Sequence, residues 1–466
     1  KEKVDMIFAE RMTPRERQEI CTLVYYPTEK IKLLKRLNAV TPYWYKINLK
    51  NLTELAKFLS SKYTRSKVRK ALPPEFSYII DELLHAQSDE DNNQYVYHEK
   101  ILDTIIDIDS ADAFIDALST LIKRLAVDHL HIVGDIYDRG PNADRIMDLL
   151  ISYHSVDIEW GNHDILWMGA ACGSEACIAN VLRNNLKYDN IEILENTYAI
   201  SLRSLTLFAE QTYPDMQPMD AALKAVSVIL FKLEGQIIMR HPEYDMVDRL
   251  LLDKIDKGRG VVRIDGQEYE LNDCYFPTLD TGDAYTLTTE EQHVIDDLRA
   301  AFVNSHMLRK HVRFLYEKGS TYMCYNGNLL FHGCIPMTED GGFAAMRLDG
   351  RDYKGRAYMD HAAKVARRAF FGNSDQSDVD FMWYLWCGKK SPLAGRTMKT
   401  FERTFVVDES TYDEPKNPYY RYYKQEEYCR KILHEFGLDS SISHIINGHT
   451  PIKVSKGESP LKANNR

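Results

Sequence analysis

Hydrophobic positions in the first 126 residues recur every three or four residues, which is the period of an amphipathic helix. The pattern predicts a helical lobe, interrupted at 85–95 by a polar stretch that we expect to form an exposed loop. The segments that carry the helical pattern most clearly are 16–26, 27–37, 52–72 and 111–125.

After this lobe the hydrophobic period changes from helical to strand-like. The sequence predicts a strand at 129–134, a helix at 143–154 that Asn142 can cap, and a second strand at 156–160. A right-handed crossover would make the two strands parallel neighbours, so the polar turns that follow them should lie at one edge of the sheet. Ligands of open α/β sheets bind at that edge.

The next part of the chain is predicted to be a mainly helical insertion over 170–319. It contains a strand-like interlude at 261–271 and a long helical segment at 289–318. Two apolar runs then flank Asn326-Gly327, the strongest short signal for a β-hairpin. The second strand of this hairpin leads directly to His332.

A last helix and a last strand are predicted near the end of the chain. The helix covers 426–436 and is ended by Gly437, and the strand covers 444–447. Together these patterns predict an α/β fold in four consecutive parts. The parts are an N-terminal helical lobe (1–126), a first piece of the core (127–169), the helical insertion (170–319) and a second piece of the core with a long loop region (320–466).

Composition narrows the classes of function. Of the 466 residues, 44% are hydrophobic and 27% charged, which is typical of a globular protein and not of a disordered one. A net charge of −10 disfavours nucleic acid and anionic membranes as partners, and means that an anionic substrate needs a local cation. Membrane-spanning and signal-peptide patterns are missing, so we expect a cytoplasmic protein; a homo-oligomer stays open.

Four polar clusters directly follow predicted strands, and they contain the candidate chemistry. Alone, an aspartate after a strand is usually a turn former, and a single histidine usually belongs to the core. Together the clusters supply a carboxylate, an amide oxygen and two imidazoles, a set suited to a divalent ion such as manganese, iron or zinc. The clusters are GDIYDRG at 134–140, GNHD at 161–164, HG at 332–333 and GHTP at 448–451.

The first two clusters resemble the motifs of the metallophosphoesterase superfamily, which has the calcineurin-like fold. Longer stretches are most similar to the class III fructose-1,6-bisphosphatases of Firmicutes-type bacteria. The resemblance covers nearly the whole chain and implies a β-sandwich core flanked by helices, with metal-dependent hydrolysis of fructose 1,6-bisphosphate in gluconeogenesis. These stretches are HIVGDIYDRGPNADRIMDLL, HSVDIEWGNHDILWMGAA, FMWYLWCGKKSPLAG and NGHTP.

The resemblance also implies a metal centre with two ions, most simply Mn²⁺. Asp135 would bridge the two ions, and Asn162, His332 and His449 would complete the shell of the second one. Two ions about 3.5 to 4 Å apart lower the pKa of a bridging water and neutralise the charge that develops on a phosphoryl group.

The same resemblance assigns catalytic roles to three residues of the first two motifs. His163 would be the general acid that protonates the leaving alkoxide, Asp138 would hold it, and Arg139 would bind phosphoryl oxygens. Because a neighbouring carboxylate favours the protonated imidazole, we expect Asp138 to raise the pKa of His163.

One family motif is missing from the sequence. The family has Asp-x-His-Gly after its first core strand, and this chain has only Asp128-His129-Leu130-His131, a poor substitute because it lies inside the strand leading to Asp135. The second metal site is therefore complete, whereas the first retains Asp135 alone. Since the chain begins without Met, we expect the motif upstream of Lys1.

The phosphate that is not hydrolysed needs a separate basic clamp, because metal ions at the reacting phosphate cannot reach it. Lys389, Lys390 and Arg396 are the candidates, with Arg351 and Arg356 as weaker ones. A solvated basic loop is an equally good interpretation of these residues.

Two other functions remain open from sequence alone. One is another phosphoesterase of the same fold, either a protein phosphatase or a dinucleoside polyphosphatase, although these have far fewer residues between GNHD and the next histidine. The other is a non-catalytic regulator with one metal site, which the missing motif would permit.

Overall fold

The computed structural model describes residues 1–85, 92–372 and 374–464. The chain divides into two compact units, Lys1–Leu130 and His131–Arg466. The four-part division predicted above, with boundaries after residues 126, 169 and 319, stays a prediction.

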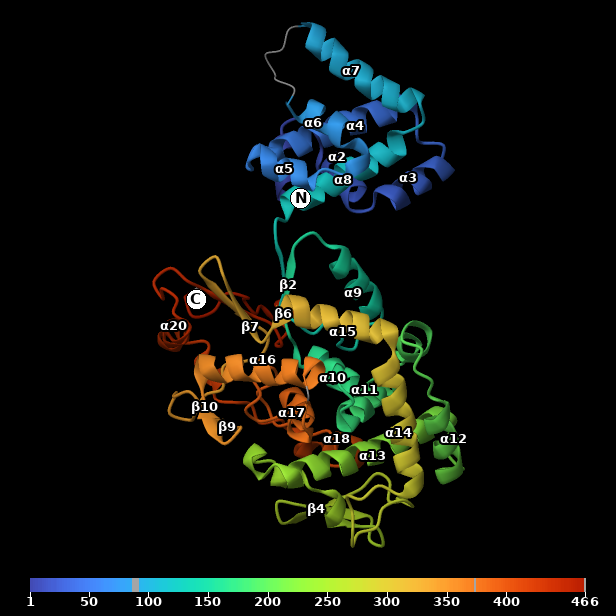
Figure 1. Ribbon diagram of the computed structural model, residues 1–466, viewed down its shortest axis with the longest axis vertical. Coiled ribbons are helices and arrows are strands. Elements are labelled where there is room, and N and C mark those ends of the chain that lie inside the picture. Colours follow the sequence, from blue (N-terminus) through green and yellow to red (C-terminus); the bar gives the residue numbers. More distant parts are fainter. Residues whose placement is uncertain (86–91, 373, 465–466) are drawn as a thin grey trace. The chain divides into compact units, whose positions relative to one another are not determined.

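The first unit is helical (Figure 1, blue to cyan). Its core forms because α8 buries one whole face, including Phe114, Leu118 and Leu121, against α2, α3 and α4. Threonine side chains cap three of the helices, Thr13, Thr41 and Thr64 each accepting a backbone N–H. The helices are α1 (Glu2–Phe8), α2 (Pro14–Tyr25), α3 (Pro27–Arg36), α4 (Pro42–Ser60), α5 (Arg65–Ala71), α6 (Ser77–His85), α7 (Asn92–Asp107) and α8 (Ala111–Ala126).

Two sequence expectations for this unit need correction. The segment 52–72 is not one helix, because α4 ends at Ser60 and Thr64 caps the separate helix α5. Of the loop expected at 85–95, residues 86–91 lie outside the described residues, and the chain from Asn92 onward is already helical in α7.

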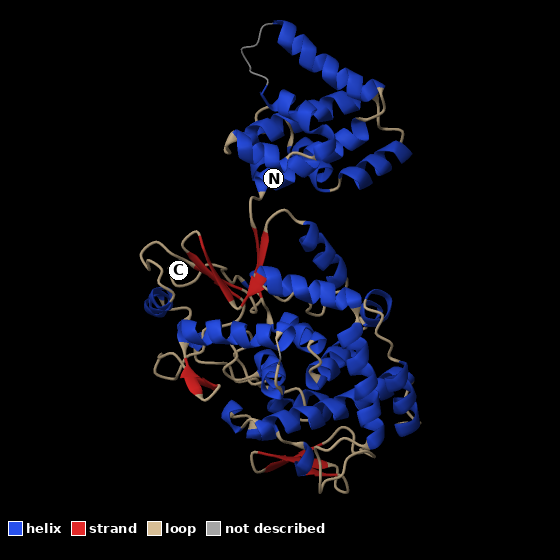
Figure 2. Cartoon of the chain, in the orientation of Figure 1, coloured by secondary structure: helices blue, strands red, loops and turns tan. Residues whose placement is uncertain are grey.

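The second unit is also rich in helices and contains several small sheets (Figure 2). The expected helix at 289–318 is two helices, because Ser305 ends the first and caps the second. The helices are α9 (Ala143–Ser152), α10 (Asn162–Ala171), α11 (Glu175–Lys187), α12 (Arg203–Thr212), α13 (Pro218–Arg240), α14 (Thr289–Asn304), α15 (His306–Lys318), α16 (Gly355–Phe371), α17 (Gln376–Cys387), α18 (Glu402–Phe405), α19 (Tyr419–Tyr422) and α20 (Glu426–Glu435).

The strands that lead to the polar clusters belong to two three-stranded sheets. The first sheet has the order β1 (Leu130–Ile132), β2 (Val156–Glu159), β6 (Gly319–Ser320), so the two predicted strands are neighbours, and β2 is parallel to β6. The second has the order β11, β8, β7, with β11 parallel and β7 antiparallel to β8. Its strands are β7 (Tyr322–Tyr325), β8 (Asn328–Phe331) and β11 (Ile445–Asn447).

The predicted hairpin and the predicted strand-like interlude are both confirmed. Asn326 and Gly327 join β7 to β8 with positive φ angles of 47° and 73°, as a two-residue hairpin turn requires. The interlude at 261–271 forms β4 (Val261–Ile264) and β5 (Gln267–Glu270), which pair with β3 (Ile255–Asp256). The remaining strands, β9 (Met346–Leu348) and β10 (Arg351–Tyr353), form an antiparallel pair.

Helix α10 positions the candidate site within the second unit. It is buried almost entirely and packs against α11 and α17, so its first residues are held at a fixed place beside the end of β2. Asn142 does stand at the start of α9, but its backbone is left-handed and its side chain makes no capping hydrogen bond, contrary to expectation. No helix of the described residues is long and apolar enough to cross a membrane.

Candidate active site

The turn after β1 carries Asp135 and lies against the turn after β2. A Cβ atom on Gly134 would be 2.5 Å from the backbone nitrogen of Gly161 and 2.7 Å from His332 Nδ1, so only glycine permits this close approach. Asp135 and His449 both have a φ of 60°, a left-handed conformation that non-glycine residues rarely adopt and that is concentrated at functional sites.

Three of the predicted metal ligands meet at this place. One ligand atom from each of Asp135, His332 and His449 lies within 4.8 Å of the others. His332 Nε2 is 3.2 Å from Asp135 Oδ2 and 3.2 Å from His449 Nδ1. His332 Nδ1 donates to the carbonyl of Val133 at 2.6 Å, which leaves the Nε2 lone pair directed at the other two ligands.

Asn162, the fourth predicted ligand, is the first residue of α10 and is 2% exposed. Its side-chain oxygen has no hydrogen-bond partner among the described residues, although buried polar atoms are normally paired. A carboxylate, an unpaired amide oxygen and two imidazoles fit a divalent cation, so the residues present are suited to the metal that the sequence predicts.

The charge states of two of these groups are those that metal ligation requires. Burial opposes protonation of the third, His332, but its contact with Asp135 raises its pKa. Burial opposes ionisation of Asp135, but the nearby imidazoles of His332 and His163 hold its pKa down at about 2. Burial and the positive charges of His332 and Arg396 lower the pKa of His449 to about 3. Asp135 is therefore anionic and His449 neutral at physiological pH, as a metal ligand must be.

The predicted acid pair is formed. His163 Nε2 lies 3.0 Å from Asp138 Oδ1, and the backbone N–H of His163 donates to Asp135 Oδ1 at 3.1 Å. The pKa of His163 is nevertheless lowered and not raised as expected, because burial, with the positive charge of Arg139, outweighs the two carboxylates. The edge of the Trp386 ring, 4.8 Å away between centroids, contributes to this burial.

Arg139 is exposed at the rim of the site and is held from α11 and the loop after it. Its guanidinium stacks over the ring of Tyr188 at 5.0 Å, its Nε is 3.6 Å from Asp138, and Asn190 donates to its backbone carbonyl at 2.6 Å. Sequence reasoning missed Tyr188 and Asn190, because no motif connects them with residue 139.

Asp164 has a structural role in the site that the motif GNHD did not reveal. Its carboxylate accepts backbone N–H groups from Asp135 at 2.8 Å, Gly161 at 2.9 Å and Tyr137 at 3.2 Å. It therefore ties the turn after β1 to the turn after β2. Burial, together with the charge of Asp135, raises the pKa of Asp164 to about 6.

The residues predicted to clamp the second phosphate contact different partners. Arg396 lies at the metal ligands, with Nη2 3.1 Å from His449 Nε2, and its Nε is buried without a partner among the described residues. Lys389 pairs with Asp248 at 2.9 Å, and Lys390 donates to the carbonyl of Ala345 at 3.3 Å. Of the weaker candidates, Arg351 lies in β10 and Arg356 donates to Tyr322.

Comparison with known proteins assigns the chain to a family. The sequence profile described as Firmicute fructose-1,6-bisphosphatase matches residues 1–466. The chain belongs to this family. It is 49% identical over 488 residues to fructose-1,6-bisphosphatase class 3 1 of Clostridium beijerinckii, covering 100% of this chain and 74% of that protein.

Other members are similarly close. The class 3 fructose-1,6-bisphosphatases of Clostridium novyi and Listeria innocua are 49% and 48% identical, again over 100% of this chain and over 74% and 75% of their own lengths. The chain thus spans about three quarters of the length of these family members. No solved structure matches it.

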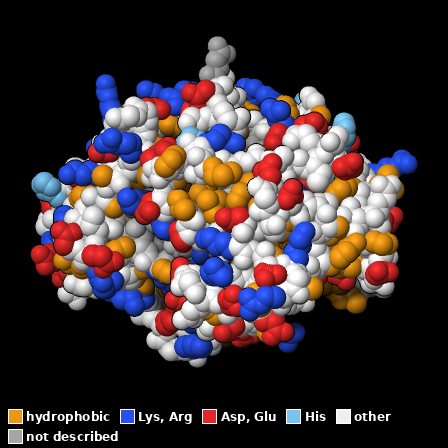
Figure 3. Space-filling view, turned by 90° about the horizontal axis from the view of Figure 1, so that it is seen from below, with side chains coloured by type: hydrophobic (Ala, Val, Ile, Leu, Met, Phe, Trp, Pro, Cys, Tyr) orange, Lys and Arg blue, Asp and Glu red, His pale blue; other side chains and the backbone are white. Residues whose placement is uncertain are grey.

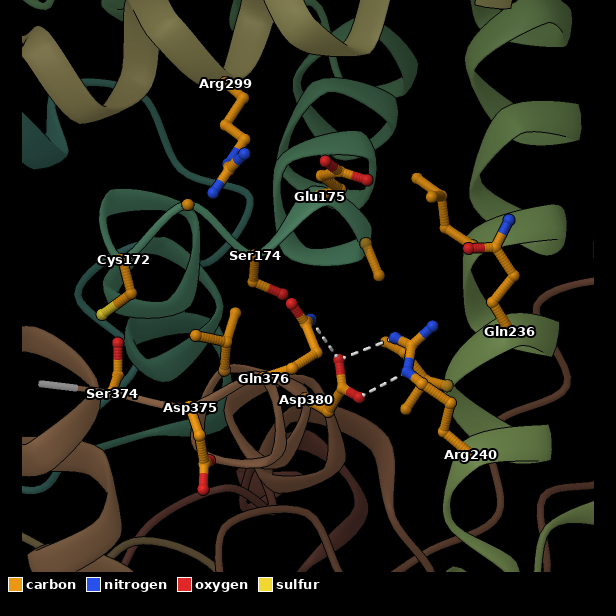
Figure 4. Close-up of a pocket in the computed structure, with 15 residues that line it drawn as sticks. Cys172, Ser174, Glu175, Gln236, Arg240, Arg299, Ser374, Asp375, Gln376 and Asp380 are labelled. Carbon is orange, nitrogen blue, oxygen red and sulfur yellow. Dashed lines mark hydrogen bonds and ion pairs between the residues drawn. The ribbon is translucent and has the colours of Figure 1, made fainter. Parts of the chain in front are cut away.

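A separate cavity of about 360 Å³ lies in the second unit, lined by none of the predicted site residues (Figure 4). Its walls come from the beginnings of α11 and α17 and from α13 and α14. Arg240 reaches into it and is paired with Asp380 at 2.9 Å, and Arg299 points into it from α14. Glu175 and Asp375 on the same walls offset these positive charges, so the cavity itself favours no anion.

Proposed function

We propose that the chain is a divalent-metal-dependent phosphatase that hydrolyses fructose 1,6-bisphosphate to fructose 6-phosphate and phosphate. One observation carries this proposal at the level of chemistry: Asp135, His332 and His449 converge next to the pair formed by His163 and Asp138. The substrate follows from the family. A cytoplasmic location, manganese as the metal and a calcineurin-like sandwich core belong to the proposal as well.

In this mechanism Asn162, His332 and His449 would hold one ion, and Asp135 would be shared between two. When bound, divalent ions acidify the attacking water and neutralise the phosphoryl charge. The water oxygen forms a bond to phosphorus while the bond from phosphorus to the sugar oxygen breaks. His163 donates its proton to that leaving oxygen, and Asp138 orients the imidazole.

Arg139 and Arg396 would bind the oxygens of the reacting phosphoryl group. A guanidinium can only donate, so His449 Nε2 accepts from Arg396 and the proton of neutral His449 lies on Nδ1. If His449 held an ion, Arg396 would lose this acceptor, and its guanidinium would be available, with that of Arg139, to donate to the phosphoryl group.

The test is phosphate release from fructose 1,6-bisphosphate with added Mn²⁺, measured for the parent and two variants. Asp135→Asn should lose both Mn²⁺ binding and activity. His163→Asn should still bind Mn²⁺, while kcat falls by about 10² to 10⁴ because the leaving alkoxide is no longer protonated. His434→Asn, an exposed histidine of α20, is the matched control and should behave like the parent.

Near-normal kcat in His163→Asn would refute the acid assignment. A parent protein that is inactive on the sugar but hydrolyses a phosphoserine peptide or diadenosine tetraphosphate would belong functionally to another phosphoesterase class. Inactivity on every phosphoester would favour a non-catalytic regulator with one metal site.

A further inference from the structure

Positive side chains gather beside Arg139, although the chain as a whole has a net charge of −10. Lys187 is the last residue of α11. Burial lowers its pKa, and the charges that lower it further are those of Arg183, Arg139 and Arg403. These four residues are called the basic cluster below.

Half of the cluster's charges have no ion-pair partner. The ammonium of Lys187 and the guanidinium of Arg183 form no ion pair within the described parts of the chain, whereas Arg403 pairs with Glu414 at 3.4 Å and Arg139 with Asp138 at 3.6 Å. Glu234 lies near enough to raise the pKa of Arg183, but its own pKa is raised to about 7 by burial, so it offsets the cluster only in part. Like charges held together without counter-charges favour binding of an anion.

Arg183 provides the fixed part of this cluster. It is 6% exposed, its Nη2 donates to Thr404 Oγ1 at 2.8 Å, and its buried Nε has no hydrogen-bond partner among the described residues. The bond to Thr404 ties α11 to α18, which brings the neighbouring Arg403 to the same place. Lys187, one turn after Arg183 on α11, is exposed and can reach a ligand.

The same helix also forms a wall of the candidate active site. Asn184 of α11 and Tyr188, the C-terminal cap of that helix, line a small hollow together with His163 and Arg139. Arg139 lines this hollow and also belongs to the basic cluster, whereas Arg183 and Lys187 are not among the lining residues. The basic cluster therefore meets the hollow that contains the proposed acid at Arg139.

We propose that the basic cluster binds the phosphate of fructose 1,6-bisphosphate that is not hydrolysed, with Lys187 as the contacting residue. The inference rests on the proposed function. A sugar bisphosphate carries two dianionic groups at opposite ends, so a second cationic region next to the first is what such a substrate needs. Arg139 belongs to both regions, which would fix the substrate's orientation between them.

This assignment differs from the one predicted on sequence grounds. Lys389 and Lys390 have partners of their own in Asp248 and the carbonyl of Ala345, whereas Lys187 has neither an ion pair nor a hydrogen bond within the described residues. An unpaired cation can bind a phosphate without first breaking an ion pair, so its net contribution is larger.

The decisive variant is Lys187→Gln, which removes the charge and keeps most of the side chain. KM for fructose 1,6-bisphosphate should rise about tenfold with kcat little changed, since one charged hydrogen bond is lost. The inhibition constant of fructose 6-phosphate, which still carries the second phosphate, should rise by a similar factor. The inhibition constant of inorganic phosphate and the kcat/KM for p-nitrophenyl phosphate should stay within about twofold.

Two comparisons make the result specific. Lys364→Gln removes a charge from an exposed position of α16 and should leave all four constants unchanged. The double variant Lys389→Ala with Lys390→Ala tests the competing clamp in the same assays. Thermal unfolding midpoints of Lys187→Gln and Lys364→Gln should match that of the parent, because both lysines are exposed and form no ion pair among the described residues.

The outcomes distinguish a failure of this inference from a failure of the proposed function. If Lys187→Gln weakens the bisphosphate and p-nitrophenyl phosphate equally, or if only the Lys389 and Lys390 variant shows the selective effect, the basic cluster is not the second phosphate site. If the parent hydrolyses p-nitrophenyl phosphate but not fructose 1,6-bisphosphate, the proposed function itself fails.

Discussion

Asp164 is the residue that joins the two ligand-bearing turns, and its chemistry yields a first prediction. In Asp164→Asn the amide oxygen can keep two of the three backbone N–H groups, but the amide nitrogen then faces the third. Removing such support typically weakens metal affinity by about 10- to 100-fold, and we expect Mn²⁺ binding to weaken by that factor. Isothermal titration calorimetry with Mn²⁺ measures it.

The control for this prediction is Asp375→Asn. Asp375 also accepts a backbone N–H, from Asp378 at the start of α17, and asparagine caps a helix as well as aspartate does. Its Mn²⁺ affinity should equal that of the parent. Unchanged affinity in Asp164→Asn would mean that the two turns keep their geometry without the carboxylate.

At the residue scale, the sequence predicted the ligands better than their support. Asp135, His332 and His449 stood out because polar clusters follow predicted strands, and the family resemblance implied their role as ligands. The structure brings them together from two different sheets. Trp386 and Tyr188, which pack on His163 and Arg139, belong to helices whose placement depends on tertiary packing. No local pattern in the chain specifies such contacts.

Strand β2 contains an acid whose burial gives the fold a dependence on pH. Both carboxyl oxygens of Glu159 are buried without a hydrogen-bond partner among the described residues. Burial, and then the charge of Asp157, raises the pKa of Glu159 from 4.5 to about 8. Between these two values the folded chain keeps a proton that the unfolded chain has lost, so stability falls as the pH rises through this window.

Glu159→Gln removes this titration and keeps the shape of the side chain. The free energy of unfolding of the variant should exceed that of the parent by an amount that grows between pH 5 and pH 8, on the order of a few kcal/mol. Urea unfolding at several pH values measures the difference. Glu317→Gln, an exposed glutamate of α15, is the control and should show a pH dependence parallel to that of the parent.

At the element scale, local sequence signals predicted turns and helix ends correctly where a steric requirement underlies the signal. Asn326-Gly327 specifies its hairpin because the turn needs two positive φ angles, and Gly437 ends α20 with a φ of 74°. Hydrophobic periodicity could not show the helix breaks at Thr64 and Ser305. There the apolar pattern continues across the break, and only the capping hydroxyl marks the new start.

At the scale of the whole molecule, net charge proved a poor guide to the local field. Acidic and basic side chains are interspersed over the face shown in Figure 3, whereas Lys187, Arg183 and Arg403 gather beside Arg139. Sequence composition averages over such groupings. The sequence predicted that β1 and β2 are neighbours and that β7 and β8 form a hairpin. It did not predict that β6 and β11 join these sheets, because both strands come from segments far along the chain.

The division into two units leads to a last prediction, about how metal stabilises the chain. Every proposed ligand lies in the second unit, His131–Arg466, while the first, Lys1–Leu130, has a hydrophobic core of its own. A ligand that binds only the folded form of one unit raises the stability of that unit alone. Differential scanning calorimetry should therefore show two transitions, of which added Mn²⁺ raises only one.

Asp135→Asn supplies the control for this experiment, because it removes the carboxylate that both ions would share. Its two transitions should be insensitive to Mn²⁺, and the one that corresponds to Lys1–Leu130 should coincide with that of the parent. If Mn²⁺ raises both transitions of the parent equally, or if a single transition is seen, the two units unfold as one cooperative block and the metal stabilises them together.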